Sequence, residues 1–216
     1  MNYGTTDGVL KLLDEVLMPD PRFKFLVVRS AENSRQFELA DLHGRLSDTR
    51  LSPAVPDDVR RQIETARNLM LYAWFVFEFQ TIAELQAYLA LELALRRRLP
   101  EAKREQRTKQ GVKLVPLTLS PLLKKAVAEG LIVPEKLPAY ARMLEWRAWH
   151  QRESAMPMAP APKAKRWLQL VMQGLPTLRN TLAHGLPKLD LFSSLNSLEL
   201  CADLINALFP ATLITT

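Results

Sequence analysis

Residues 83–99, AELQAYLALELALRRRL, contain the pattern that decides the fold of this chain. Alanines recur there at the i, i+4, i+7 and i+11 spacing of one helix face, at Ala83, Ala87, Ala90 and Ala94. Such a ridge of small residues lets the backbone of another helix approach closely. Bulky side chains occupy the opposite side, namely Leu85, Tyr88, Leu89, Leu95 and Leu99. The stretch therefore predicts a helix that packs against other helices.

Glu92 lies within the bulky face of this predicted helix. A carboxylate in an apolar stripe is costly unless it is paired, so we expect Glu92 to contact a cation. Arg96, one turn later, is the nearest candidate and would form an ordinary i,i+4 pair with a structural role. An arginine arriving from another helix would instead favour a catalytic role.

Helical periodicity also dominates on both sides of this stretch. A long helical region begins after Pro56 and extends to Leu99, with a bend or break expected near Gln80 and Thr81. Other helices are predicted over residues 6–18, 121–130, 134–154, 163–173 and 190–209, and a break is predicted at residues 174–176. The predicted fold class is therefore an all-α helical bundle.

The region before Leu51 is expected to be an N-terminal appendage, residues 1–50, on a main domain of residues 51–216. Residues 22–28 suit a short strand, while residues 37–46 fit either a second strand or a helix. The appendage thus carries either a small β-hairpin, with its turn at Asn33 and Ser34, or an extra helix. A large insert at about residues 103–163 interrupts the main domain and ends in a proline-rich extended connector.

The composition is that of an ordinary globular protein of 216 residues, with 48% apolar and 24% charged residues. The longest apolar run, residues 69–79, is about half as long as a membrane span requires, so no membrane partner is expected. Cys201 is the only cysteine, and the first residues do not resemble a signal peptide. We therefore expect a cytoplasmic protein.

Positive charge is concentrated after the predicted core helix. Residues 96–113 contain eight Lys or Arg against two Glu, while the whole chain has a net charge of +6. Such a patch attracts polyphosphates, and the same charges can equally serve only as a solvated helix end and loop. The expected RNA-binding residues are Arg96, Arg97, Arg98, Lys103, Arg104 and Arg107.

Residues 178–185, LRNTLAHG, are the stretch best suited to chemistry, because no glycine-rich phosphate loop is present. The three histidines and Cys201 show no metal-ligand spacing, so we expect neither a metal nor a cofactor. Asn180 and His184 share a helix face at i,i+4, and Arg179 is long enough to reach the same cleft. An imidazole can accept a proton from a 2′-hydroxyl, and a guanidinium matches phosphate oxygens. Equally, the three side chains can be ordinary residues of a helix end.

This motif, Arg179-Asn180 followed by His184-Gly185, resembles the R-x(4–6)-H motif of the HEPN superfamily (higher eukaryotes and prokaryotes nucleotide-binding). Residues 87–99 also resemble the long core helix of that superfamily. The resemblance implies an all-α bundle that acts as a metal-independent RNase in toxin-antitoxin or host-defence systems. It further implies that Arg179 and His184 are the catalytic pair, that Asn180 positions them, and that a homodimer joins two motifs across one cleft. A cognate antitoxin is then a possible partner.

Two features depart from the superfamily pattern: Pro176, which lies shortly before the motif, and the insert at residues 103–163. Our expectation is cleavage of single-stranded or loop RNA by 2′-hydroxyl attack, leaving a 2′,3′-cyclic phosphate. Tyr140, Trp146 and Trp149 either stack on unpaired bases or are core or interface residues. The alternative is a non-catalytic HEPN-like module that binds nucleotide, RNA or a protein partner.

Overall fold

The computed structural model describes residues 10–29, 34–108, 111–153, 157–185 and 190–211, and its fold is mostly helical, which confirms the all-α class. Its α-helices are α1 (Leu39–Asp48), α2 (Asp57–Tyr72), α3 (Phe79–Arg98), α4 (Leu119–Ala128), α5 (Pro138–Glu153), α6 (Ala164–Ala183) and α7 (Leu191–Leu208). Two antiparallel hairpins accompany them: β1 (Val27–Arg29) with β2 (Ser34–Gln36), and β3 (Lys103–Thr108) with β4 (Gly111–Pro116). Single 3-10 turns are η1 (Pro21–Phe25) and η2 (Pro134–Lys136).

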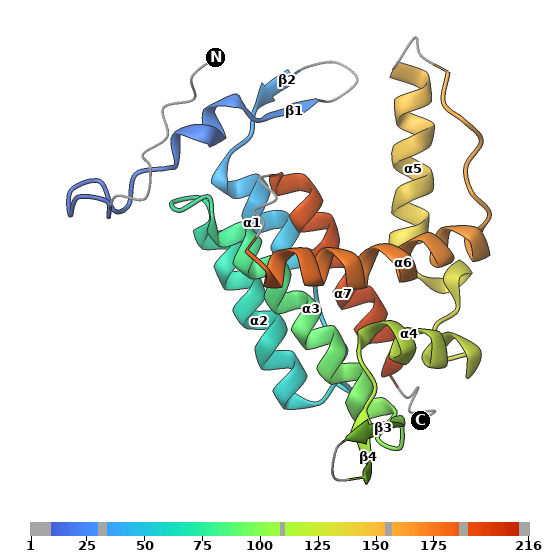
Figure 1. Ribbon diagram of the computed structural model, residues 1–216. Helices are drawn as coiled ribbons and strands as arrows, with labels where there is room; N and C mark the ends of the chain where they lie inside the picture. The colour runs from blue at the N-terminus through green and yellow to red at the C-terminus, as the bar shows by residue number, and fades with distance from the viewer. Residues whose placement is uncertain (1–9, 30–33, 109–110, 154–156, 186–189, 212–216) are drawn as a thin grey trace, which may run out of the picture.

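Helix α3 is the central element, and it packs mainly against α2 and α7 (Figure 1). The four alanines of its predicted ridge are completely buried, which confirms the close helix packing that their spacing predicts. The preceding helix ends at Tyr72, so the break falls at residues 73–78, slightly earlier than Gln80 and Thr81. Among the described helices, none combines the length and apolarity that crossing a membrane requires.

Helix α6 runs without interruption through Gly174 and Pro176, so the predicted break at residues 174–176 is wrong. A proline inside a helix removes one backbone hydrogen bond and usually distorts the helix. Here Leu168, Leu175 and Leu182, on one face of α6, are buried in the core. Packing of this amphipathic face outweighs the missing bond, because tertiary burial supplies most of a helix's stability.

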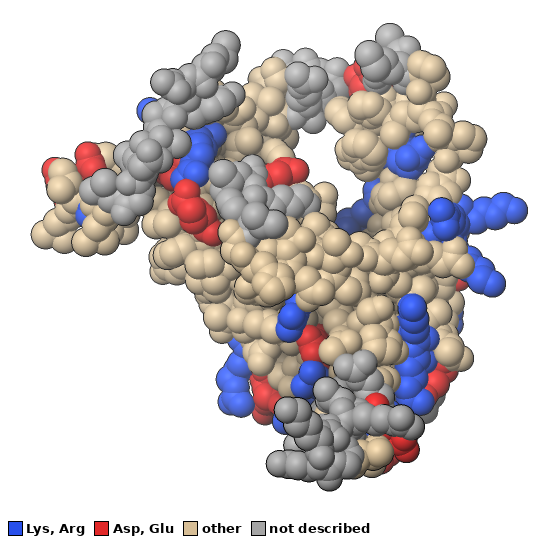
Figure 2. Space-filling view, viewed as in Figure 1, with Lys and Arg blue, Asp and Glu red and all other residues tan. Residues whose placement is uncertain are grey.

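Helix α5 projects from the body of the molecule, and the space-filling view shows a hollow between it and the N-terminal region (Figure 2). Residues 157–163 form an extended connector, as predicted. The structure adds that this connector runs back beside α5. The Tyr140 hydroxyl donates a 3.1 Å hydrogen bond to the Pro162 carbonyl, and the Tyr140 ring lies 5.2 Å from that of Trp167. These contacts tie the start of α5 to the start of α6.

The N-terminal region contains both elements that the sequence left as alternatives, a β-hairpin and a helix. Residues 34–36 form β2, and α1 follows, so the interpretation of residues 37–46 as a strand is wrong. Phe23 and Phe37 are buried in the common hydrophobic core. The described part of the predicted first helix, residues 10–18, consists of turns with exposed leucines, so no helix forms there. Asn33, expected in the hairpin turn, lies outside the described residues.

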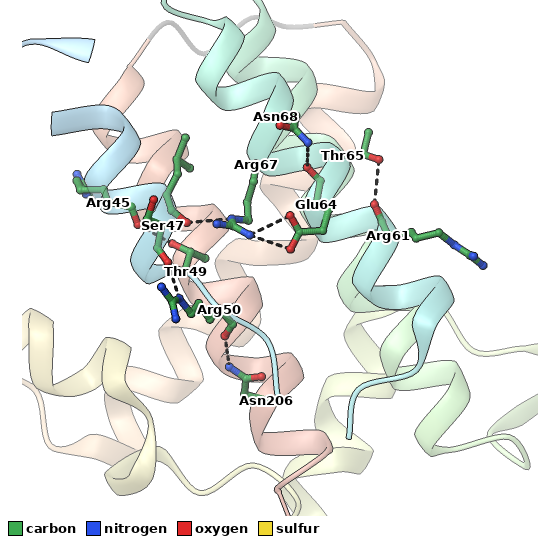
Figure 3. Close-up of polar contacts among 11 residues, drawn as sticks. Arg45, Ser47, Thr49, Arg50, Arg61, Glu64, Thr65, Arg67, Asn68 and Asn206 are labelled. Carbon is green, nitrogen blue, oxygen red and sulfur yellow. Dashed lines mark hydrogen bonds and ion pairs between the residues drawn. The ribbon is translucent and has the colours of Figure 1, made fainter. Parts of the chain in front are cut away.

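The connection between α1 and α2 is held by arginine side chains that bond to backbone carbonyls (Figure 3). Arg67 donates from Nε to the Leu46 carbonyl at 2.9 Å and binds both carboxylate oxygens of Glu64. Arg50 donates to the Ser47 carbonyl at 3.0 Å, and its own carbonyl accepts from Asn206 of α7 at 2.9 Å. Cations suit this position because the last carbonyls of α1 carry partial negative charge.

The insert contains a second hairpin, β3–β4, which the helical prediction did not include. Its strands begin within the basic segment that follows α3. Helix α4 begins at Leu119, close to the predicted start, and Gly130 follows its end with a φ of 70°. That conformation suits glycine and confirms Gly130 as the stop of this helix.

Candidate functional site

The candidate site forms where α6 crosses the end of α3, and Glu92 is its centre. Glu92 is only 8% exposed, and it accepts a 2.5 Å hydrogen bond from Arg96, so the predicted i,i+4 pair is confirmed. Arg179 of α6 also reaches this carboxylate, with its Nη2 3.5 Å from Glu92 Oε2. The arginine from another helix is therefore an additional partner of Glu92, and two guanidiniums offset the cost of burying one carboxylate.

Arg179 retains donor capacity in this arrangement. Its contact with Glu92 is longer than an ordinary charge-assisted hydrogen bond, and its Nη1 lies 3.3 Å from the Asn180 side-chain oxygen. Its Nε is buried and has no hydrogen-bond partner among the described residues. Buried polar atoms are normally paired, so this N–H is an unsatisfied donor at the edge of the candidate site.

A small cleft of about 190 Å³ adjoins this arginine. It is lined by Glu92, Thr118, Leu119, Ser120, Pro176, Arg179 and Asn180. Hydroxyl, amide and guanidinium groups and the Glu92 carboxylate share the lining with the apolar side chains of Leu119 and Pro176. The volume is below the roughly 300 Å³ at which small-molecule pockets begin. The cleft can thus accept a group of phosphate size but cannot enclose a whole nucleotide.

The first turn of α4 supplies the hydroxyls of the cleft, which the sequence reasoning did not assign to the site. Thr118 is the N-cap position of α4, and Ser120 lies in its first turn. The sequence signal that could have identified them is the pair of hydroxyl residues at a predicted helix start. Backbone N–H groups are also unpaired at such a position and can bind an anion. Their approach to α6 depends on the long-range packing of α4 against α6.

His184 is placed differently from the other two motif residues. It is the C-cap residue of α6, it is exposed, and it does not line the cleft. Five positions separate it from Arg179, which corresponds to a rotation of roughly 140° around a helix axis. Within one chain, the structure therefore brings Arg179 and Asn180 together at the cleft. His184 lies outside the cleft, at the C-terminal end of the same helix.

The basic residues expected to bind RNA divide into paired and exposed groups. Arg96 bonds to Glu92, and Arg97 forms an ion pair with Asp58 at the start of α2. This pair keeps the pKa of Asp58 below its ordinary value. Arg98 is exposed at the end of α3. The last three expected residues lie on β3, where Lys103 is exposed, while the side chains of Arg104 and Arg107 lie outside what the structure describes.

A second polar cluster lies inside the core and was not anticipated from the sequence. The Tyr88 hydroxyl donates to Glu84 at 2.6 Å and lies 3.1 Å from the Ser197 hydroxyl. The Ser194 hydroxyl donates to the other Glu84 oxygen at 2.7 Å. All of these groups are buried, so the cluster joins α3 to α7 and is closed to a substrate.

Among the described residues, no group of three or more His, Cys, Asp or Glu could hold a metal ion.

Comparison with known proteins adds no assignment to this geometry. No family model matches the chain, and the comparison with curated proteins and solved structures found no match.

Proposed function

We propose that this protein is a metal-independent endoribonuclease of the HEPN type that cleaves RNA by 2′-hydroxyl attack. The observation that carries the proposal is the Arg179 guanidinium, which lines a cleft of phosphate size and whose Nε–H is unpaired among the described residues. A guanidinium stabilises the extra negative charge that develops on a phosphorane. Asn180, within hydrogen-bond distance of Arg179, orients it from the same turn of α6.

In this proposal His184 moves the proton and acts from the exposed end of α6. It deprotonates the 2′-hydroxyl or protonates the leaving 5′-oxygen, and the product carries a 2′,3′-cyclic phosphate. Because His184 does not line the cleft of its own chain, we propose a homodimer in which two motifs share one substrate channel. The role that remains for Glu92 is to hold Arg179 in place.

The test compares single substitutions in metal-free buffer containing EDTA. Arg179→Ala and His184→Ala should each lower the cleavage rate of single-stranded RNA by about 100-fold or more, the range expected for removing a positioned acid–base or charge-stabilising group. His43→Ala is the matched control, because His43 is also an exposed histidine at a helix surface and should change the rate less than two-fold. Products should carry cyclic-phosphate ends, and light scattering should give twice the mass of one chain.

One observation favours a second function, a non-catalytic binding module. Arg179 is paired with the Glu92 carboxylate, and His184 does not line the cleft beside Arg179. This arrangement suits a site that holds a bound phosphate without cleaving it. Under this alternative, RNA binding weakens in Arg179→Ala, but wild-type protein never produces cyclic-phosphate ends. Cleavage that is unchanged in both motif variants would contradict the nuclease proposal.

A further inference from the structure

Helix α5 is unusual among the described helices because it has no buried residue. It nevertheless carries large apolar side chains, and Trp146 is 54% exposed. A helix without a buried face contributes little core packing, so its exposed aromatic surface has no evident role in stabilising this chain. Exposed apolar surface of this kind commonly marks a site of interaction.

The aromatic residues of α5 divide into two groups. Tyr140 is structural, since its hydroxyl bonds to Pro162 and its ring packs on Trp167. Trp146 and His150 instead stack on each other, with ring centroids 5.2 Å apart and an interplanar angle of 12°. Trp149 is tilted against His150, with the two ring centroids 6.4 Å apart.

The connector covers a different face of α5. A cavity between helix and connector is lined by Leu144, Arg147, Ala148 and Gln151 on the helix, and by residues 158–161 opposite. Arg147 also donates a hydrogen bond to the Ala159 carbonyl. Trp146 and His150, which lie one turn apart on the helix, do not line this cavity and so remain available to a partner.

Positive charge is present on α5 itself and at the start of α6, which the Tyr140 contacts hold beside the start of α5. The described residues of α5, the connector and the first turn of α6 contain six Lys or Arg against Glu145 and Glu153. Lys163, Lys165 and Arg166 are exposed, and no ion pair joins them to another described residue. Figure 2 shows Lys and Arg side chains projecting along the side of the molecule where α5 meets α6. Of the six, Arg142 is paired with Glu199 and Asp203 of α7, just as Arg96 and Arg97 of the segment expected to bind RNA are paired with acids.

We propose that Trp146 and His150, together with Lys163, Lys165 and Arg166, form a binding site for single-stranded RNA. An unpaired base stacks on Trp146, and the phosphates on either side contact the basic residues at the start of α6. The inference rests on the proposed function, because it takes RNA as the ligand. Stacked aromatics beside a basic surface are typical of sites for unpaired bases, and the net positive charge favours RNA over an apolar protein partner.

Binding can be measured without cleavage by using a fluorescent 2′-O-methyl oligoribonucleotide, because it lacks the nucleophilic 2′-hydroxyl. Wild-type protein should bind the single strand more tightly than the corresponding duplex. Trp146→Ala should weaken single-strand binding about ten-fold or more, within the range measured for loss of one stacking platform. Trp146→Phe should restore most of the affinity. Leu144→Ala, on the connector side of the same helix, is the matched control and should change it less than two-fold.

The charge contribution is tested separately. Lys165→Gln with Arg166→Gln should weaken binding and make its salt dependence less steep. Arg61→Gln is the matched control, because the Arg61 side chain points away from its neighbours on α2 (Figure 3).

Equal affinities of wild type and Trp146→Ala would overturn the inference, as would an equal loss in Leu144→Ala. A change in oligomeric state in Trp146→Ala with unaltered RNA affinity would also overturn it, since that result identifies a protein interface. Failure of the proposed function gives a different result: Trp146-dependent binding persists, but natural RNA is not cleaved. Cleavage that does not depend on Trp146 supports the nuclease and rejects this site.

Discussion

At the scale of single residues, Tyr88 shows how one buried hydroxyl connects two core helices. Burial raises the pKa of Tyr88 well above its ordinary value, so the hydroxyl remains a donor to Glu84. Tyr88→Phe leaves a buried carboxylate oxygen without this donor, and we expect the free energy of unfolding to fall by about 1–3 kcal/mol. Urea denaturation measures the difference.

Tyr72→Phe is the matched control for this prediction. Tyr72 is 54% exposed at the end of α2, so losing its hydroxyl should change the free energy of unfolding by less than about 0.5 kcal/mol. Equal stability of the Tyr88→Phe and Tyr72→Phe variants would mean that the Glu84 cluster does not stabilise the core.

Asp41 gives a prediction about pH. Its carboxylate accepts two hydrogen bonds from Arg35 and one from the backbone N–H of Glu38, and these lower its pKa to about 2. The ionised form is favoured in the folded state, so this contribution to stability is present above the ordinary value of 3.8 and is lost as the pH falls through about 2.

The measurement for Asp41 is an NMR titration of its side-chain carboxyl. Arg35→Ala should raise the Asp41 pKa towards 3.8, because it removes the largest cause of the shift. An Asp41 pKa that is the same in both proteins would show that Arg35 does not bind it in solution.

Local spacing predicts some of the site contacts and cannot predict others. The Glu92–Arg96 pair follows from one helical turn, and it is present. Arg179 and Glu92 are far apart in the sequence, as are Arg97 and Asp58, so those contacts depend on how the helices pack. The sequence identifies which residues can carry chemistry, but their grouping requires the tertiary structure.

At the scale of elements, Pro176 lowers the stability of α6 because it lies inside the helix. We expect Pro176→Ala to raise the free energy of unfolding by about 1–3 kcal/mol, because alanine restores a backbone donor inside the helix. Thermal and urea unfolding measure the change. Gln173→Ala, an exposed position on the same helix, should alter it by less than about 0.5 kcal/mol. A lower stability of Pro176→Ala would show that the proline fits its helix without strain.

Helices could be predicted wherever the apolar pattern matched a face that the core later buries, as in α3 and α7. Residues 10–18 show the same periodicity, but they have no core to cover, and Leu13 is 93% exposed. The β3–β4 hairpin was missed because β3 is entirely polar, and the alternating Val112 and Leu114 of β4 face solvent and cover no core. For residues 10–18, periodicity alone was therefore not sufficient, because no tertiary packing accepts their apolar face.

At the scale of the whole molecule, Cys201 reports on the integrity of the core. It is fully buried, and burial raises the pKa of its thiol well above the ordinary value. A thiol reagent such as DTNB should therefore react with the native protein far more slowly than with the urea-unfolded chain, and the rate should rise with urea in step with unfolding. Rapid modification without denaturant would indicate local opening of α7.

The continuity of α6 also sets a distance between the two proposed RNA contacts. This single rod of 20 residues, about 30 Å long, starts at the basic residues Lys165 and Arg166 of the proposed RNA site and ends at the motif. In this proposal, RNA that is bound at the start of α6 reaches the motif at the end of α6 after a fixed distance. The protein would then act as a molecular ruler, cutting at a constant spacing from the anchored nucleotide and yielding fragments of one dominant size.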